Sequence, residues 1–355
     1  MAAPVLPNFT ERSLAFARAC FNGPLNIGIS AACAALLIWL VPPLFNWAVW
    51  NATLNGNAAQ CREAGGACWA FIREKFWFSV FGLYPYEERW RSGLMLVILV
   101  TLVVGSTFRA FWNKWLIITW VIAAPLMLVL MGGGVLGLSP VATRLWGGIT
   151  ITGIIAVYGL ALGYPLAILL ALGRRSRLPL VRWFSTAVIE CVRGVPLISL
   201  LFMAAIMLPL FLPDGVTLDR LARVLVAYTI FTAAYMAEVV RGGLQAMPRG
   251  QYEAADAMGL SYWQKTRLII LPQALSITIP SQVNTFIGLF KDTTLVIVIG
   301  VFDFFTTLRS ALGDPNWLGF PTEAYVFAAG VYFLLCFTMS KYSQKLERDF
   351  QPAGR

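Results

Sequence analysis

The chain has 355 residues, of which 59% are hydrophobic and only 12% are charged, and its mean hydropathy is +0.72. Because a soluble domain carries about 25% charged residues, this composition predicts an integral membrane protein and excludes a disordered chain. The net charge of +10 falls in segments between apolar stretches, which excludes a nucleic-acid-binding face, and the absence of histidine excludes a Ser-His-Asp triad and His-ligated zinc.

Eight apolar stretches are long enough to cross, as helices, a hydrocarbon core about 30 Å thick. In chain order they cover about 27–49, 92–108, 115–138, 146–172, 195–213, 221–240, 273–290 and 323–340. The first is too long and too far from the N-terminus for a cleaved signal peptide, so we expect it to remain as an anchor. The predicted fold class is therefore all-α, a polytopic membrane protein with about eight transmembrane helices.

The positions of the Lys and Arg residues predict the orientation. If the N-terminus is inside, most of the 27 basic residues lie in inner segments. Over half of the outer basic residues fall in one long insertion, at about 50–91, and long loops carry little topological information. The excess of inner positive charge and the even number of helices predict that both termini are cytoplasmic, with residues 346–355 as a cytoplasmic tail.

The N-terminal extension, residues 1–141, contains three of the spans and the outer insertion at about 50–91, which is rich in Trp, Phe and Tyr. We favour an insertion that lies on the membrane surface through these aromatic side chains, and contact with an outer partner is the alternative. Cys61 and Cys68 enclose two glycines that would let a short loop close, so a disulfide is predicted if this side is oxidising. Two free thiols are the alternative.

Residues 142–345 differ from the extension because their inner loops are long and charged and their outer loops are short. A cytoplasmic loop at about 241–272 has helix-forming alanines, then Gly259 where a left-handed residue would end a helix, then Ser261 and Gln264 as a capping box. This pattern predicts two short helices joined by a turn. Such an ordered loop suits docking of a soluble protein, and a self-contained amphipathic linker is the alternative.

Several segments of this second region resemble a known family. Glu253-Ala254-Ala255, Gly259 six residues after the glutamate, and Ile270-Leu271-Pro272 resemble the EAA loop of permease subunits of bacterial ABC importers. Four further segments are similar to the polar amino-acid uptake branch of that family, namely 190–197, 237–243, 271–274 and 291–295. The resemblance covers about 142–345. The three additional N-terminal spans look like those of the larger permease of a general L-amino-acid transport system.

The resemblance implies a type I ABC importer permease core of five helices, preceded here by three N-terminal helices, in a bacterial inner membrane. It implies alternating access coupled to a dimer of ATP-binding subunits, with a second related permease, a periplasmic amino-acid-binding protein and membrane lipid as the other partners. It also implies that four residues contact the ATPase, namely Glu253, Ala254, Ala255 and Gly259. No Gly-x-x-x-x-Gly-Lys-Ser/Thr sequence occurs, so ATP and Mg are expected in the partner ATPase, and no cofactor or catalytic residue in this chain.

Ionisable residues at the inner ends of the spans have two interpretations each. Glu238 either pairs with Arg241, one helical turn later, or lines the substrate pathway, and the two interpretations weigh equally. Glu190 and Arg193 have the same spacing, and there a structural ion pair is favoured over a role in the pathway.

The seventh span carries the remaining pathway candidates. Lys291 and Asp292 either pair with each other or break this span. A zwitterionic amino acid that crosses the bilayer also needs uncharged polar partners, for which the same span offers Ser281, Gln282 and Asn284. Polar residues in spans also hold helices together, so these three have a structural interpretation as well.

The leading prediction is the transmembrane permease subunit of an ATP-driven importer of polar or general L-amino acids. The alternative is a stand-alone secondary transporter or channel for small polar solutes. The ordered inner loop and the lack of inverted repeats in the sequence argue against that alternative. An enzyme that acts within the membrane is disfavoured because the chain has no histidine and no clustered carboxylates.

Overall fold

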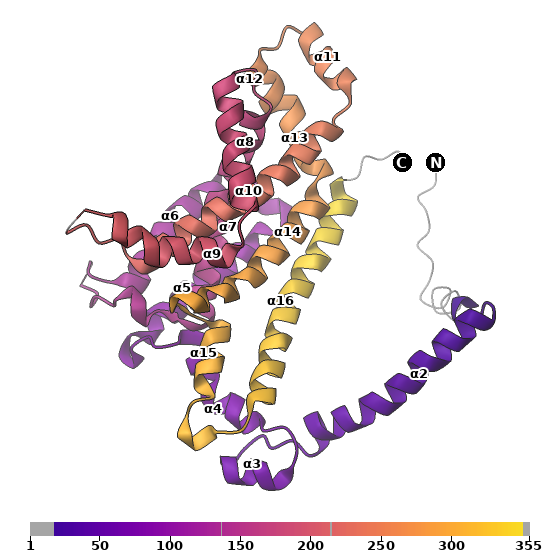
Figure 1. Ribbon diagram of the computed structural model, residues 1–355, viewed down its shortest axis with the longest axis vertical. Coiled ribbons are helices and arrows are strands. Elements are labelled where there is room, and N and C mark those ends of the chain that lie inside the picture. The colour runs from indigo at the N-terminus through magenta and orange to yellow at the C-terminus, as the bar shows by residue number, and fades with distance from the viewer. Residues whose placement is uncertain (1–17, 136, 214, 351–355) are drawn as a thin grey trace. The chain divides into compact units, whose positions relative to one another are not determined.

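The structure, a computed structural model, describes residues 18–135, 137–213 and 215–350 (Figure 1). In these residues the regular elements are helical apart from the two-residue strand β1 (Phe302–Asp303). Seven helical segments are long and apolar enough to cross a membrane, and the bent pair Pro179–Arg193 and Leu197–Phe211 makes an eighth if it is one span. The prediction of an all-α polytopic protein with about eight transmembrane helices is confirmed.

The first of two compact parts comprises the described residues up to Glu74, together with Asn316–Glu323. Its elements are α2 (Pro24–Phe45), the π-helical turn η1 (Asn46–Trp50), α3 (Ala58–Ala64) and the beginning of α4 (Trp69–Phe81). α2 is apolar except for Asn26 and Ser30, and none of its side chains is buried. α3 begins at a capping box between Asn57 and Gln60 and ends at Gly65, whose φ is 65°.

The outer insertion is folded within this part. Cys61 and Cys68 form a disulfide, with their Cα atoms 5.4 Å apart. The backbone N–H of Cys68 donates to Glu323 Oε1 at 3.0 Å, and the fully buried ring of Phe71 packs against Phe320. Because an aromatic ring is stabilised by burial among apolar side chains, Phe71 packs inside the protein. The prediction that the aromatic residues of the insertion lie on the membrane surface is wrong for this residue.

The second part comprises Lys75–Pro315 and the described chain from Ala324. Its long helices are α5 (Arg89–Ser106), α6 (Lys114–Gly132), α7 (Gly148–Arg174), α8 (Pro179–Arg193), α10 (Arg220–Ala246), α14 (Ile279–Asp292) and most of α16 (Pro321–Phe350). The most extensive helix pair is α7 with α10. A Cβ atom on Gly159 of α7 would lie 2.2 Å from Cδ1 of Tyr228 on α10, so the close approach of the two helices requires glycine there.

Two hydrophobic clusters lie along the α7–α10 pair. The larger cluster includes Phe81 and Tyr84, so the end of the predicted insertion belongs to the main core of this part. The smaller cluster joins α7, α8 and α10 to the helix that follows the loop predicted at about 241–272. In Figure 1 the loop helices α11 (Arg249–Ala257) and α12 (Tyr262–Lys265) lie at one end of this part, and α15 (Phe304–Ala311) lies toward the other.

The span predicted at 195–213 is irregular. It begins as α9 (Leu197–Phe202) and continues through the π-helix η5 (Met203–Met207) and the 3-10 helix η6 (Leu208–Phe211). It meets α8 at a bend of 102°. Pro196 lies at this bend, and because proline has no N–H it cannot extend the hydrogen-bonding ladder of α8.

The span predicted at 273–290 is interrupted at Thr278, and its helical structure continues beyond residue 290 to Ile299. α13 (Leu271–Ile277) stops at Thr278, and α14 then runs into the 3-10 helix η8 (Thr293–Ile299). Pro280 in the first turn of α14 lacks the N–H that would continue α13. Lys291 and Asp292 therefore lie within a continuous helical segment, and the interpretation that they break the span is wrong.

Candidate functional site

The loop between α10 and α13 has the predicted local structure. α11 ends at Ala257, Gly259 has a φ of 71°, and α12 begins at a capping box in which Ser261 and Gln264 bond each other's backbone N–H. The positive φ of Gly259 is accessible to glycine at little cost, which explains why the turn falls there. α10 extends to Ala246, so the loop begins later than the predicted 241.

The four residues expected to contact an ATPase do not share one environment. Glu253, Ala254 and Gly259 are exposed, whereas Ala255 is fully buried within the chain. Among the described residues no ion pair includes Glu253. Glu253 and Ala254 are therefore free to meet a partner, and Ala255 instead packs α11 against its own chain.

Large apolar side chains on the loop were missed by the sequence analysis. Met258, Tyr262 and Trp263 are 64%, 53% and 68% exposed, and the Tyr262 and Trp263 rings pack edge to face. An exposed apolar group of this kind, on the same loop as the exposed Glu253, is typical of a protein-binding surface. Hydropathy could not reveal it because a few apolar residues in a polar loop do not raise a window average.

Arg175 at the end of α7 holds the loop in place. Its Nη1 donates to the carbonyl oxygen of Leu244 at 2.7 Å and to the hydroxyl of Tyr252 at 3.1 Å. The guanidinium carbon also lies 5.7 Å from the centre of the Tyr252 ring, a cation–π contact. Because Tyr252 belongs to α11, Arg175 connects the loop helix directly to a long helix of the bundle.

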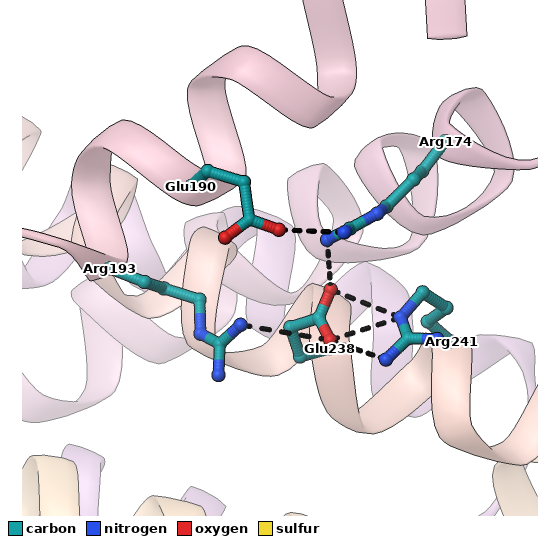
Figure 2. A network of polar contacts seen from close by, with 5 residues as sticks. All are labelled: Arg174, Glu190, Arg193, Glu238 and Arg241. Carbon is teal, nitrogen blue, oxygen red and sulfur yellow. Dashed lines mark hydrogen bonds and ion pairs between the residues drawn. The ribbon is translucent and has the colours of Figure 1, made fainter.

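Next to Arg175 lies a cluster of five charged residues, which we call the ion cluster: Arg174, Glu190, Arg193, Glu238 and Arg241 (Figure 2). Glu238 is at its centre. Its carboxylate lies 2.5 Å from Arg174 Nη1 and 2.7 Å from Arg241 Nη2, and Arg193 Nη1 is 3.7 Å away. The predicted pair between Glu238 and Arg241 is confirmed.

The other predicted pair has different partners. Glu190 binds Arg174 at 2.6 Å, whereas Arg193 faces Glu238. The pairing follows from the fold, because the ends of α7, α8 and α10 converge at this point. The ion cluster therefore ties three helices together beside the loop, and it favours the structural interpretation of Glu238.

The uncharged pathway candidate Gln282 is bound within the chain. Its Oε1 accepts a hydrogen bond from the Tyr164 hydroxyl at 2.7 Å, and its Nε2 donates to the Leu275 carbonyl and the Thr278 hydroxyl, both at 2.8 Å. The side chain is buried, and both of its polar atoms are satisfied. Gln282 thus bridges the break between α13 and α14 and fastens it to α7.

The remaining pathway candidates lie on a different face of α14. Asn284 and Lys291, seven residues apart on one helix, share a face and are exposed, as is Ser281. Asp292 is half-buried. No ion pair among the described residues includes Lys291 or Asp292, so the predicted pair between them is not formed. The described part of the chain also has no group of three or more Cys, Asp or Glu side chains that could hold a metal ion.

Residues 163–347 match the family described as the binding-protein-dependent transport system inner membrane component. The chain belongs to this family. It is a multi-pass permease subunit of an inner-membrane ABC importer, a transport subunit that works with a separate ATPase and a substrate-binding protein, and the nucleotide binds to the ATPase. The predicted family membership is confirmed.

Permeases of this family match the chain to different extents. The inner membrane amino-acid ABC transporter permease protein YhdY of Escherichia coli strain K12 is 50% identical over 93% of this chain and 90% of its own length. The glutamate/glutamine/aspartate/asparagine transport system permease protein BztC of Rhodobacter capsulatus is 39% identical over 93% of this chain and 92% of its own length. The glutamate/aspartate import permease protein GltK of Escherichia coli O157:H7 is 36% identical over 57% of this chain and 91% of its own length.

A solved structure shares the fold of the permease region. One chain of the crystal structure of an amino acid ABC transporter with histidines is 29% identical and superposes with a TM-score of 0.51. The superposition covers 57% of this chain and 92% of that chain. Almost the full length of the solved chain therefore corresponds to a little over half of the present chain.

Proposed function

We propose that the chain is the permease of an importer for polar or general L-amino acids, and that it moves its substrate by alternating access. The relatives support the substrate class, because YhdY is described as an amino-acid permease and BztC as a permease for glutamate, glutamine, aspartate and asparagine. The other partners in this proposal are a dimer of ATP-binding subunits, a second related permease and a periplasmic amino-acid-binding protein.

The proposed division of the chain is an N-terminal extension at 1–141, a permease core at 142–345 and a tail at 346–355. Unequal coverage by the relatives supports it, because GltK aligns with 57% of the chain and YhdY with 93%. The distribution of basic residues supports a cytoplasmic position for both termini. The same orientation puts the loop between α10 and α13 (Leu271–Ile277) on the side where ATP is available.

The observation that carries the proposal is the surface of this loop. Glu253 and Ala254 are exposed on α11, and Met258, Tyr262 and Trp263 extend that surface toward α12. Arg175 fixes α11 to α7, so a force on the loop would reach the bundle through a direct hydrogen bond. A stand-alone channel or secondary transporter has no need of such a surface.

Reversal of one charge tests the proposal. Glu253→Lys should insert normally, because the side chain is exposed and has no ion-pair partner in the described chain. We expect it to abolish ATP-driven uptake and to lower capture of the ATPase subunit at least tenfold, since like charges facing each other across an interface cost more than the roughly 1.4 kcal/mol that corresponds to a factor of ten. Uptake of labelled amino acid and a pull-down of the ATPase measure the two effects.

The matched control is Glu347→Lys, which reverses an exposed acidic residue on α16, outside the loop. It should leave both uptake and ATPase capture unchanged. Normal ATP-dependent transport by the Glu253→Lys protein, with the ATPase still bound, would show that the coupling surface lies elsewhere. Uptake that persists without any ATPase would instead favour a channel or a secondary transporter.

A further inference from the structure

A cavity of about 470 Å³ lies between the N-terminal ends of α7 and α10 and the turn before α15. Its volume falls within the range of about 300–1,000 Å³ that is typical of sites for small molecules. Its polar lining comes from Thr143, Arg144, Asp219, Arg220 and Arg223 and from the backbone at Gly300. On α10, Glu238 of the ion cluster is 15 positions after Arg223 of the cavity, so at about 1.5 Å per residue the two sites are roughly 20 Å or more apart.

The cavity carries unbalanced positive charge. Three arginines and one aspartate line it, so its formal charge is +2. Asp219 offsets one of the three positive charges but forms no ion pair with an arginine, because its Oδ1 accepts the N–H of Ala222 as the cap of α10 and its Oδ2 accepts the Thr143 hydroxyl. Among the described residues no ion pair within 4.0 Å includes any of the three arginines.

Stabilisation of the helix does not account for these cations. Arg220 and Arg223 lie in the first turn of α10, where the positive end of the helix dipole disfavours a positive side chain. Cations held at this end of a helix, in excess of the single acidic side chain beside them, are expected where an anion binds.

The guanidinium groups have donors to spare. Arg223 contacts the carbonyls of Ala204 and Ala205 through Nη1, and its buried Nε has no hydrogen-bond partner. Arg220 makes one long bond, from Nη1 to the Ile299 carbonyl at 3.4 Å. Arg144 is exposed and has no side-chain partner in the described part of the chain. Since each guanidinium carries five N–H donors, several donors remain for a ligand.

We propose that this cavity binds a carboxylate, and that its positive charge favours a solute with a net charge of −1, such as L-glutamate, over its neutral amide. Guanidinium groups suit this ligand because they form charge-assisted, bidentate hydrogen bonds with a carboxylate. The inference deepens the proposed function and rests on its orientation of the chain, which puts the cavity at the outer mouth of the transporter. The carboxylate comes either from a free amino acid or from an acidic side chain of the binding protein.

The first arm of the test uses the assembled transporter in lipid nanodiscs, without the binding protein and without ATP. L-Glutamate and L-glutamine are the probes because they match in size and differ in the charge of the side chain. We expect Arg144→Gln to weaken L-glutamate binding by about five- to tenfold and to change L-glutamine binding by less than about twofold. Arg144 is chosen because it makes no internal bond, so its replacement should not disturb the fold. Equilibrium dialysis with labelled amino acid measures both affinities.

The second arm measures capture of the binding protein by the same nanodiscs. If an acidic side chain of the binding protein supplies the carboxylate, free L-glutamate does not bind, and Arg144→Gln weakens capture of the binding protein by about fivefold. The matched control in both arms is Arg309→Gln, an exposed arginine on α15 that does not line the cavity. If Arg144→Gln and Arg309→Gln behave alike in both arms, the cavity is not a carboxylate site and the inference is overturned.

Uptake by the wild-type complex separates this inference from the proposed function. If the wild-type complex transports and Arg144→Gln is indistinguishable from its control, the carboxylate site fails and the proposed function stands. If the wild-type complex does not transport but Arg144→Gln still loses L-glutamate binding, the site stands and the proposed function fails.

Discussion

Glu238 shows how far a local spacing predicts the contacts of one residue. The i,i+3 spacing correctly predicts its pair with Arg241, because both residues lie on one helix turn. Arg174 and Arg193 come from other helices, 64 and 45 positions before Glu238 in the sequence, and no local pattern reveals them. The same limit applies to Arg175 and Tyr252, which meet only because α7 and α11 pack together.

Removal of the central charge of the ion cluster should destabilise the chain. Glu238 is 15% exposed and pairs with three arginines, so Glu238→Gln would leave Arg193 and Arg241 without an ion-pair partner in the cluster. We expect a loss of about 2 kcal/mol, less than for a fully buried pair because water still reaches the cluster. The thermal unfolding midpoint of the detergent-solubilised chain measures this change.

Glu190→Gln is the control for that experiment. Glu190 is 54% exposed and has one partner, so we expect a loss of less than about 1 kcal/mol. Equal shifts of the unfolding midpoint in the two variants would contradict the central role of Glu238. Recovery of stability in a Glu238→Gln, Arg241→Gln double variant would show that uncompensated charge is the cause.

At the scale of elements, hydropathy locates the spans but not their breaks. The first span is predicted to within a few residues, because length and apolar content alone define it. The bend before α9 and the stop at Thr278 depend on single prolines and on long-range hydrogen bonds such as that between Tyr164 and Gln282. A window average does not register these features.

The turn between α11 and α12 is an element that local signals do predict, and its glycine can be tested. Gly259 has a φ of 71°, and a Cβ added there would meet no atom within 4 Å, so a substitution strains the backbone without a clash. Gly259→Val should cost about 1–2 kcal/mol in this conformation and distort the loop. We expect loss of uptake with normal insertion, measured by transport and by the amount of protein in the membrane.

Gly259→Asn is the matched substitution. Asparagine enters the left-handed region more readily than other residues with a side chain, so this variant should keep most of the uptake. If Gly259→Val and Gly259→Asn transport equally well, the conformation of this turn does not matter for coupling, and the loop acts only through its exposed surface.

At the scale of the whole chain, the sequence predicts membership of the permease family but not the way the insertion folds. The insertion and the beginning of α16 are about 250 residues apart, yet Cys68 contacts Glu323 in α16 and Phe71 contacts Phe320 directly before it. The match of 163–347 to the family explains the success, because the segments that carry the resemblance lie mostly within it. The insertion lies outside that match and has no comparable pattern.

The disulfide of the insertion tests the proposed orientation of the whole chain. Disulfides persist in the oxidising periplasm and not in the reducing cytosol, so a bond between Cys61 and Cys68 requires that the insertion be outside. We expect mass spectrometry without reductant to show one linked peptide that contains both cysteines. A membrane-impermeant maleimide, added to intact cells, should label the pair only after mild reduction.

Cys191 provides the internal control, because it is exposed on α8 and belongs to the opposite side in the proposed orientation. It should react with the maleimide only after the cells are opened. The closed loop is short, so loss of the bond in Cys61→Ser should lower the stability of the insertion by about 2–3 kcal/mol in the chain-entropy model. Labelling of Cys61 and Cys68 in intact cells without reductant would refute the bond, and labelling of Cys191 from outside would refute the orientation.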